Sequence, residues 1–162
     1  MALNDYLLEH DGVDWNDSLQ TWRWLLPERF TLWMANRFGD CFIVVDDGSV
    51  EMLDVSAGRI EKLANSRDEF AEKLDLDDNA DLWLMIPLVD QLVAAGVTLV
   101  PDRCYGFRQP TVIGGEYAVT NVAVMSIRQY LRGCGKLHEQ LKDVADGEQV
   151  VLRTDFGEAD EI

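Results

Sequence analysis

Residues that favour β-strands are concentrated between residues 30 and 55, in the runs FTLWMANRF, CFIVV and VEMLDV. Gly39 and Gly48 divide this stretch into three runs, because glycine supplies the positive φ that tight hairpin turns require. A further turn at Gly58 leads into residues 59–63. The pattern predicts an antiparallel meander of three to five strands.

Helical spacing of apolar residues on either side of this meander predicts two short helices. The first is expected to begin at Asp17 or Ser18 and to end before Pro27. The second is expected to begin at Ser66, which forms a capping box with Glu69 because each side chain can bind the free backbone N–H of the other.

Two longer helices are predicted in the second half of the chain. Residues 80–95 are apolar on most sides, so we expect this helix to be largely buried. Pro87 should kink it or mark a break and a restart. Residues 125–144 also have helical period, and we expect Gly133 and Gly135 to divide them.

Strands and helices that occupy separate parts of the chain, without alternation, predict an α+β fold. We expect an antiparallel sheet, with the meander and a C-terminal strand at residues 149–153, packed against three to four helices. The expected organisation is an acidic N-terminal arm (1–16), a single α+β domain (17–154) and an acidic, disordered tail (155–162).

The charge of the chain limits the partners that it can bind. There are 30 acidic and 14 basic residues, a formal net charge of −16. Such a field repels nucleic acids and anionic membranes and attracts basic proteins, although acidity can also serve only to keep a protein soluble. The N-terminal residues lack the basic region and apolar run of a signal peptide, so we expect a cytoplasmic protein.

Candidate catalytic and metal-binding groups are few. Cys104 is the best nucleophile, but only arginines lie near it in the sequence. His138 lies in a segment that resembles half of a zinc-protease helix, but the position of the second histidine is Lys142. We interpret both as structural residues and expect no enzymatic activity, no cofactor and no metal site.

The most distinctive segment of the chain, residues 104–121, combines the aromatic residues Tyr105, Phe107 and Tyr117 with the glycine pair Gly114-Gly115. It resembles a motif of a bacterial family, first catalogued as a domain of unknown function, that forms the C-terminal domain of type VI secretion immunity proteins. The stretch around His138 fits the same family. From their own chemistry, we interpret these residues mainly as groups that hold a loop on the core. The motif residues are Cys104, Tyr105, Phe107, Pro110, Gly114, Gly115, Tyr117, Asn121 and His138.

The resemblance implies a non-catalytic protein that protects a cell from a DNase toxin by binding it. A toxin that grips phosphates presents a basic cleft, which a strongly acidic partner complements. The alternative is a regulatory or scaffold domain that binds another protein through an apolar patch around Trp83 or Trp33. The acidic residues expected to bind the partner, chosen by charge density, are Asp46, Asp47, Glu51, Asp68, Glu69, Glu72, Asp77 and Asp78.

Overall fold

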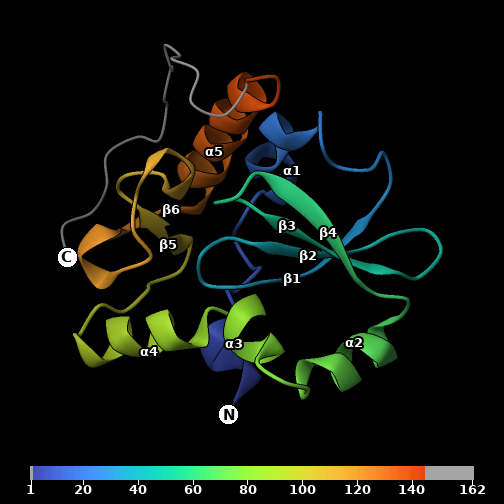
Figure 1. Ribbon diagram of the computed structural model, residues 1–162, viewed down its shortest axis with the longest axis horizontal. Helices are drawn as coiled ribbons and strands as arrows, with labels where there is room; N and C mark the ends of the chain where they lie inside the picture. Colours follow the sequence, from blue (N-terminus) through green and yellow to red (C-terminus); the bar gives the residue numbers. More distant parts are fainter. Residues whose placement is uncertain (1, 145–162) are drawn as a thin grey trace.

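A four-stranded antiparallel sheet lies at the centre of the structure, a computed structural model that describes residues 2–144 (Figure 1). Its strands follow one another in the order β1-β2-β3-β4, so the predicted meander is confirmed. A second sheet consists of β5 paired with β6. The strands are β1 (Thr31–Ala35), β2 (Cys41–Val44), β3 (Val50–Asp54), β4 (Arg59–Ala64), β5 (Arg103–Phe107) and β6 (Val122–Ser126).

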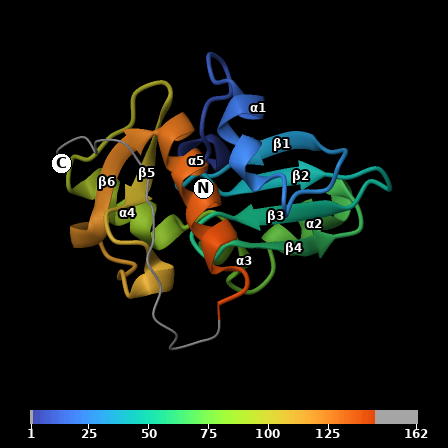
Figure 2. The same ribbon diagram turned by 90° about the horizontal axis from the view of Figure 1, so that it is seen from above.

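Helices cover both faces of the four-stranded sheet, so the predicted α+β fold is confirmed. In Figure 1, α1 and α5 lie above the sheet, and α2 and α3 lie below it. Figure 2 shows α5 between the two sheets. The helices are α1 (Trp15–Ser18), α2 (Arg67–Leu74), α3 (Asn79–Trp83), α4 (Ile86–Ala94) and α5 (Ile127–Leu141), with 3-10 turns η1 (Leu3–Tyr6), η2 (Gln20–Trp22), η3 (Thr111–Ile113) and η4 (Val119–Asn121).

Alternation along the strands produces two apolar clusters, one on each face of the sheet. Met52 in β3 belongs to the cluster under α2 and α3, where Phe70 is buried. The next residue, Leu53, belongs to the opposite cluster, which contains Trp22 and Leu131. Successive side chains of a strand point to opposite faces, so a single strand holds both helical layers.

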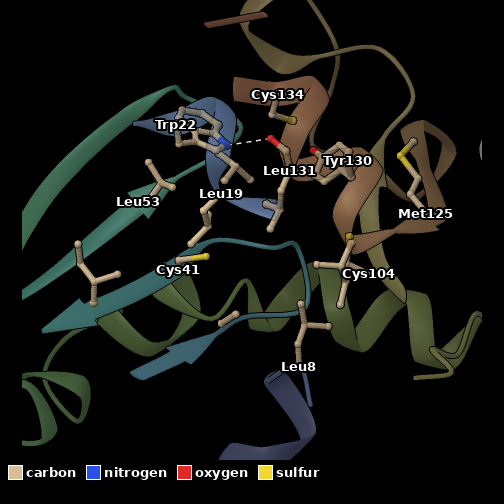
Figure 3. Packing of buried hydrophobic residues seen from close by; sticks show 14 of the residues in the cluster. Leu8, Leu19, Trp22, Cys41, Leu53, Cys104, Met125, Tyr130, Leu131 and Cys134 are labelled. Atoms are coloured by element: carbon tan, nitrogen blue, oxygen red, sulfur yellow. Dashed lines mark hydrogen bonds between the residues drawn. The ribbon is translucent and has the colours of Figure 1, made fainter. Parts of the chain in front are cut away.

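The helix α5 runs unbroken across the two glycines at which a division was predicted, so that prediction is wrong. Gly133 and Gly135 are buried, and a methyl group on Gly135 would overlap Thr21 of η2. At this close approach, the indole N–H of Trp22 donates to the carbonyl of Leu131 at 2.8 Å (Figure 3). Gly135 therefore allows two backbones to meet, and neither glycine ends the helix.

The first helix begins earlier than predicted. It starts after Asp14, whose side chain accepts a hydrogen bond from the backbone N–H of Asp17 at 3.1 Å. Ser18, one of the two expected caps, is buried, and its hydroxyl donates to the carbonyl of Asp14 at 2.8 Å. The cap is therefore one turn upstream of the predicted position, and α1 gives way to η2 after Leu19.

The predicted break at Pro87 is confirmed: α3 ends at Trp83, and α4 begins at Ile86. Because proline has no N–H, the carbonyl four residues earlier loses its helical donor. That carbonyl belongs to Trp83, and the side chain of Asn36 donates to it at 2.9 Å. The break therefore joins the α3 layer to the end of β1.

The first residues of the chain lie against the sheet. Leu8 is buried, and its N–H donates to the carbonyl of Ala35 at 2.8 Å. The hydroxyl of Tyr6 donates to Asp90 in α4 at 2.7 Å. The boundary of an arm at residue 16 stays a prediction.

The predicted C-terminal strand and the predicted tail lie outside the described residues. Within residues 2–144, no helix combines the length and apolar character needed to cross a membrane.

Candidate partner-binding surface

Negative charge is concentrated in the layer formed by α2, α3 and α4. We call residues 67–90 the acidic layer. Only Arg67 and Lys73 are basic in this segment. Its acidic residues are Asp68, Glu69, Glu72, Asp75, Asp77, Asp78, Asp81 and Asp90.

The start of α2 is fixed by its cap. The hydroxyl of Ser66 accepts a hydrogen bond from the backbone N–H of Glu69 at 3.0 Å, which is one half of the predicted capping box. The carboxylate of Glu69 binds Lys73 at 3.0 Å and the side chain of Asn65 at 3.3 Å. Hydrogen bonds from Lys73 and Asn65 lower the pKa of Glu69, so this charge is largely compensated within the chain.

The other acidic side chains of α2, of the turn that follows and of the first turn of α3 have no such partners. They point to solvent and form no hydrogen bond or ion pair with any other residue of the described part of the chain. Charges that are not compensated internally remain available to a partner with lysine or arginine side chains. These free carboxylates are Asp68, Glu72, Asp75, Asp77, Asp78 and Asp81.

Two large apolar side chains are exposed among these carboxylates. Leu76 is 55% exposed and Leu82 is 61% exposed. Val93 in α4 is 47% exposed, so the prediction that residues 80–95 are largely buried is wrong for one side of this segment. Leu84 and Leu92 on the opposite side are buried. Exposed apolar groups within a polar rim are typical of protein interfaces.

Leu76 and Leu82 were not among the predicted partner-binding residues. The sequence signal for Leu76 and Leu82 is the mixture of leucine and aspartate in residues 74–82. The core does not require a leucine at both positions. Composition alone drew attention to the acids of this run and not to the apolar residues between them.

The patch suggested around two tryptophans is largely used inside the domain. Trp83 stacks on Phe70, with ring centroids 5.3 Å apart, and Trp33 meets the same ring edge-on at 5.3 Å. Both tryptophans are half-buried, and the guanidinium of Arg67 covers the ring of Trp33.

Three predicted partner-binding residues lie outside the acidic layer. Asp46 and Asp47 occupy the turn between β2 and β3, at the end of the sheet where α2 begins. Asp46 binds Arg29 at 2.8 Å, and Asp47 accepts from the N–H of Ser49 at 2.9 Å. Glu51 is half-buried on the face of the sheet that α2 does not cover. The structure therefore groups five of the eight predicted acids: Asp68, Glu69, Glu72, Asp77 and Asp78.

The opposite helical layer has the opposite charge balance. The helix α5 contains Arg128, Arg132 and Lys136, with Glu139 as its one acidic residue. Asp17 in α1 binds Arg128 and, at 3.0 Å, Arg132. Charge is therefore segregated between the two layers, with free carboxylates on one and compensated arginines on the other.

Aromatic residues of the family motif hold β5 in the core. The hydroxyl of Tyr105 donates to the carbonyl of Val97 at 2.6 Å. Phe107 stacks on Phe38, with centroids 5.3 Å apart, and Tyr117 meets Phe107 edge-on at 5.1 Å. These contacts support the structural interpretation of the motif.

The polar residues of the motif close the loop between β5 and β6. Asn121 accepts from the N–H of Gln109 at 2.9 Å and donates to the carbonyls of Gln109 and Glu116 at 3.0 and 2.9 Å. A side chain on Gly115 would overlap the carbonyl of Gln109, and Gly114 has a φ of 99°. Both glycines are therefore required by the shape of this loop. Pro110 precedes η3 within it.

The two catalytic candidates are buried. Burial raises the pKa of the Cys104 thiol well above its ordinary value, which disfavours the reactive thiolate. Burial lowers the pKa of His138, whose Nε2 lies 3.1 Å from the carbonyl of Val55 and donates to it. The space beside His138 is about 10 Å³, and a side chain on Gly58 would overlap the imidazole. Cys104 and His138 thus contribute to packing in this fold.

Among residues 2–144, no three cysteine, histidine or acidic side chains are grouped so that they could hold a metal ion.

Fold and surface define a small α+β domain with one strongly acidic helical layer. Residues 64–138 match the family model described as T6SS immunity protein Tdi1, C-terminal. The match confirms the resemblance seen in the motif residues, and it includes the whole acidic layer. The matched family is a domain of type VI secretion immunity proteins, and no curated protein matches the chain.

Proposed function

We propose that this protein is a cytoplasmic immunity protein that neutralises a nuclease-type toxin by binding it through the acidic layer. The observation that carries the proposal is the set of free carboxylates around Leu76 and Leu82, on a segment that lies within the match to an immunity-protein family. No catalytic step is needed, because a protein that covers a toxin's cleft blocks access to its substrate.

Electrostatics and apolar contact have separate roles in this proposal. Carboxylates without internal partners attract the basic cleft of a nuclease from a distance and raise the association rate. Leu76 and Leu82 then lose their exposed surface against the toxin and slow dissociation. The carboxylates therefore raise the association rate, and the leucines lower the dissociation rate.

The experiment is co-expression of the full chain with the toxin domain encoded beside its gene. We expect cells to keep intact chromosomal DNA and the two proteins to co-purify as a stoichiometric complex. DNA degradation in the presence of soluble, folded chain would reject the immunity role. Protection from a toxin that leaves DNA intact in unprotected cells would reject only the nuclease part.

A further inference from the structure

Residues 75–78 form an exposed turn that joins α2 to α3 (Figure 1). All four side chains of this turn are exposed, and that of Leu76 is 55% exposed. Packing against the core therefore does not hold the turn in one conformation. An exposed segment that is ordered only by its partner loses conformational entropy on binding, and this loss weakens the complex.

A residue at the start of α3 fixes the turn instead. The side-chain amide of Asn79 donates to the carbonyl of Lys73, near the end of α2, at 2.8 Å. The same carbonyl accepts from the backbone N–H of Leu76 at 3.0 Å. The backbone N–H of Asn79 donates to the carbonyl of Leu76 at 3.2 Å. Asn79 therefore closes the turn with both its side chain and its backbone, and Leu76 lies within the closed segment.

The turn also contains a backbone conformation that depends on the residue type. Asp77 has a φ of 49°, which lies in the left-handed region. Aspartate and asparagine tolerate this region because their short polar side chains can bond locally, whereas alanine disfavours it. The next residue, Asp78, has an ordinary φ of −104°, and its side chain makes no capping hydrogen bond. Two neighbouring aspartates of equal charge thus differ in what the backbone requires of them.

We propose that Asp77 and Asn79 are positioning residues, which hold the turn in its docking conformation before the toxin binds. This role rests on the toxin binding proposed above and adds to it a contribution that is independent of charge. Because the turn is already ordered, Leu76 and the carboxylates beside it meet the toxin at a lower entropic cost than a free loop would. The gain slows dissociation of the complex, since long-range attraction depends on the charges alone.

Hydrogen–deuterium exchange of the free chain tests the positioning role without a toxin. Asn79→Ala removes the side-chain donor that closes the turn. We expect the backbone amides of residues 75–79 to exchange at least about 10-fold faster in this variant, and those of β2 and β3 to keep their rates. Equal exchange of the turn in the variant and the wild type would overturn the positioning role and leave the immunity role standing.

Two pairs of variants test the effect on recognition at constant charge. Asp77→Asn and Asp77→Ala each remove one carboxylate, but only alanine disfavours the left-handed conformation. The binding partner is the toxin domain encoded beside the gene. We expect Asp77→Ala to dissociate from it about 5- to 10-fold faster than Asp77→Asn, with equal association rates. Asp78→Asn and Asp78→Ala are the matched control pair, and they should dissociate at equal rates.

Surface plasmon resonance gives both rates, and circular dichroism checks that each variant is folded. The positioning role is overturned if the two Asp77 variants dissociate at equal rates, or if the Asp78 pair differs as much as the Asp77 pair. In either case binding by the wild type keeps the immunity role intact. A wild-type chain that does not bind the toxin would reject both.

Discussion

The two helical layers on the central sheet differ in how their polar groups are used. On the α5 side, Arg132 binds Asp17, and backbone carbonyls of α5 accept from the side chains of Thr21 and Trp22. On the α2–α4 side, the carboxylates of the turn before α3 bind no described residue. One layer therefore uses its polar groups to fix the fold, and the other leaves them free. The comparison separates positions that determine stability from positions available for recognition.

The largest effect is expected at the contact between η2 and α5. Trp22 has no exposed surface, and its N–H donates to Leu131. Trp22→Ala should lower the free energy of unfolding by about 3–5 kcal/mol, because it leaves a cavity and an unpaired carbonyl. Urea unfolding followed by circular dichroism measures the change. A loss below about 1 kcal/mol would contradict the role of this contact.

A smaller effect is expected at the buried carboxyl of Asp40. Its oxygens accept from Asn36 at 2.8 Å and from the N–H of Val55 at 2.9 Å. An amide cannot accept at both atoms, so Asp40→Asn should cost about 1–3 kcal/mol of unfolding free energy. Thermal or urea unfolding at pH 5 gives this value.

The same residue predicts a pH dependence. Burial, with a contribution from nearby Asp54, raises the pKa of Asp40 to about 8. The folded chain therefore holds a proton that the unfolded chain loses near pH 4, so stability is lost as the pH rises towards 8. The amide in Asp40→Asn does not titrate, and the destabilisation by this substitution should shrink between pH 5 and 8.5. A destabilisation that grows with pH would show that the carboxylate form is preferred.

Truncation of an exposed side chain in the acidic layer should reduce toxin affinity and leave the free energy of unfolding nearly unchanged. Leu82→Ala removes an exposed side chain, so the free energy of unfolding should change by at most about 0.5 kcal/mol. The affinity for the toxin should fall about 10-fold, as for a central apolar contact. Surface plasmon resonance and urea unfolding of the same preparation separate the two quantities. Equal effects on both would place Leu82 in the fold and not in the interface.

The smallest effect is expected for the compensated charges of α5. Arg132 is 25% exposed and binds the carboxylate of Asp17 at 3.0 Å and the side chain of Gln20 at 3.1 Å. Arg132→Gln should cost about 0.2–1 kcal/mol of unfolding free energy, the range of ion pairs near the surface. Toxin affinity should not change, whereas a clear loss of affinity would move the interface to the α5 face.

Local signals in the sequence predicted much of the fold. Turn glycines separated the strands of the meander, Ser66 marked the start of α2, and Pro87 marked the break between α3 and α4. Each of these features depends on a few neighbouring residues, so it is visible in the chain.

Features that depend on distant contacts were not predicted. From the sequence alone, Gly135 predicts the end of a helix. The close approach of Thr21 shows instead that α5 requires a glycine at this position. The run at residues 74–82 gave the position of most free charges. On the opposite face, the basic charges of α5 are compensated through the contact of α1 with α5. No local pattern in the sequence predicts that contact.

The central claim is that free carboxylates of one layer dock the protein onto a basic toxin. The most direct test compares association rates with the toxin for the wild type and two variants that each replace four acids with amides. One changes Asp75, Asp77, Asp78 and Asp81. The other changes Asp11, Glu28, Glu116 and Glu139, whose side chains are exposed outside the acidic layer and have no hydrogen-bond partner in the described part of the chain.

Stopped-flow measurements at low and high salt give these rates. We predict that the first variant associates about 10- to 100-fold more slowly at low salt and loses most of its salt dependence. The second variant should stay within about 3-fold of the wild type, because its charges lie outside the docking layer. Equal slowing of both variants would mean that net charge alone drives association, and it would contradict the account.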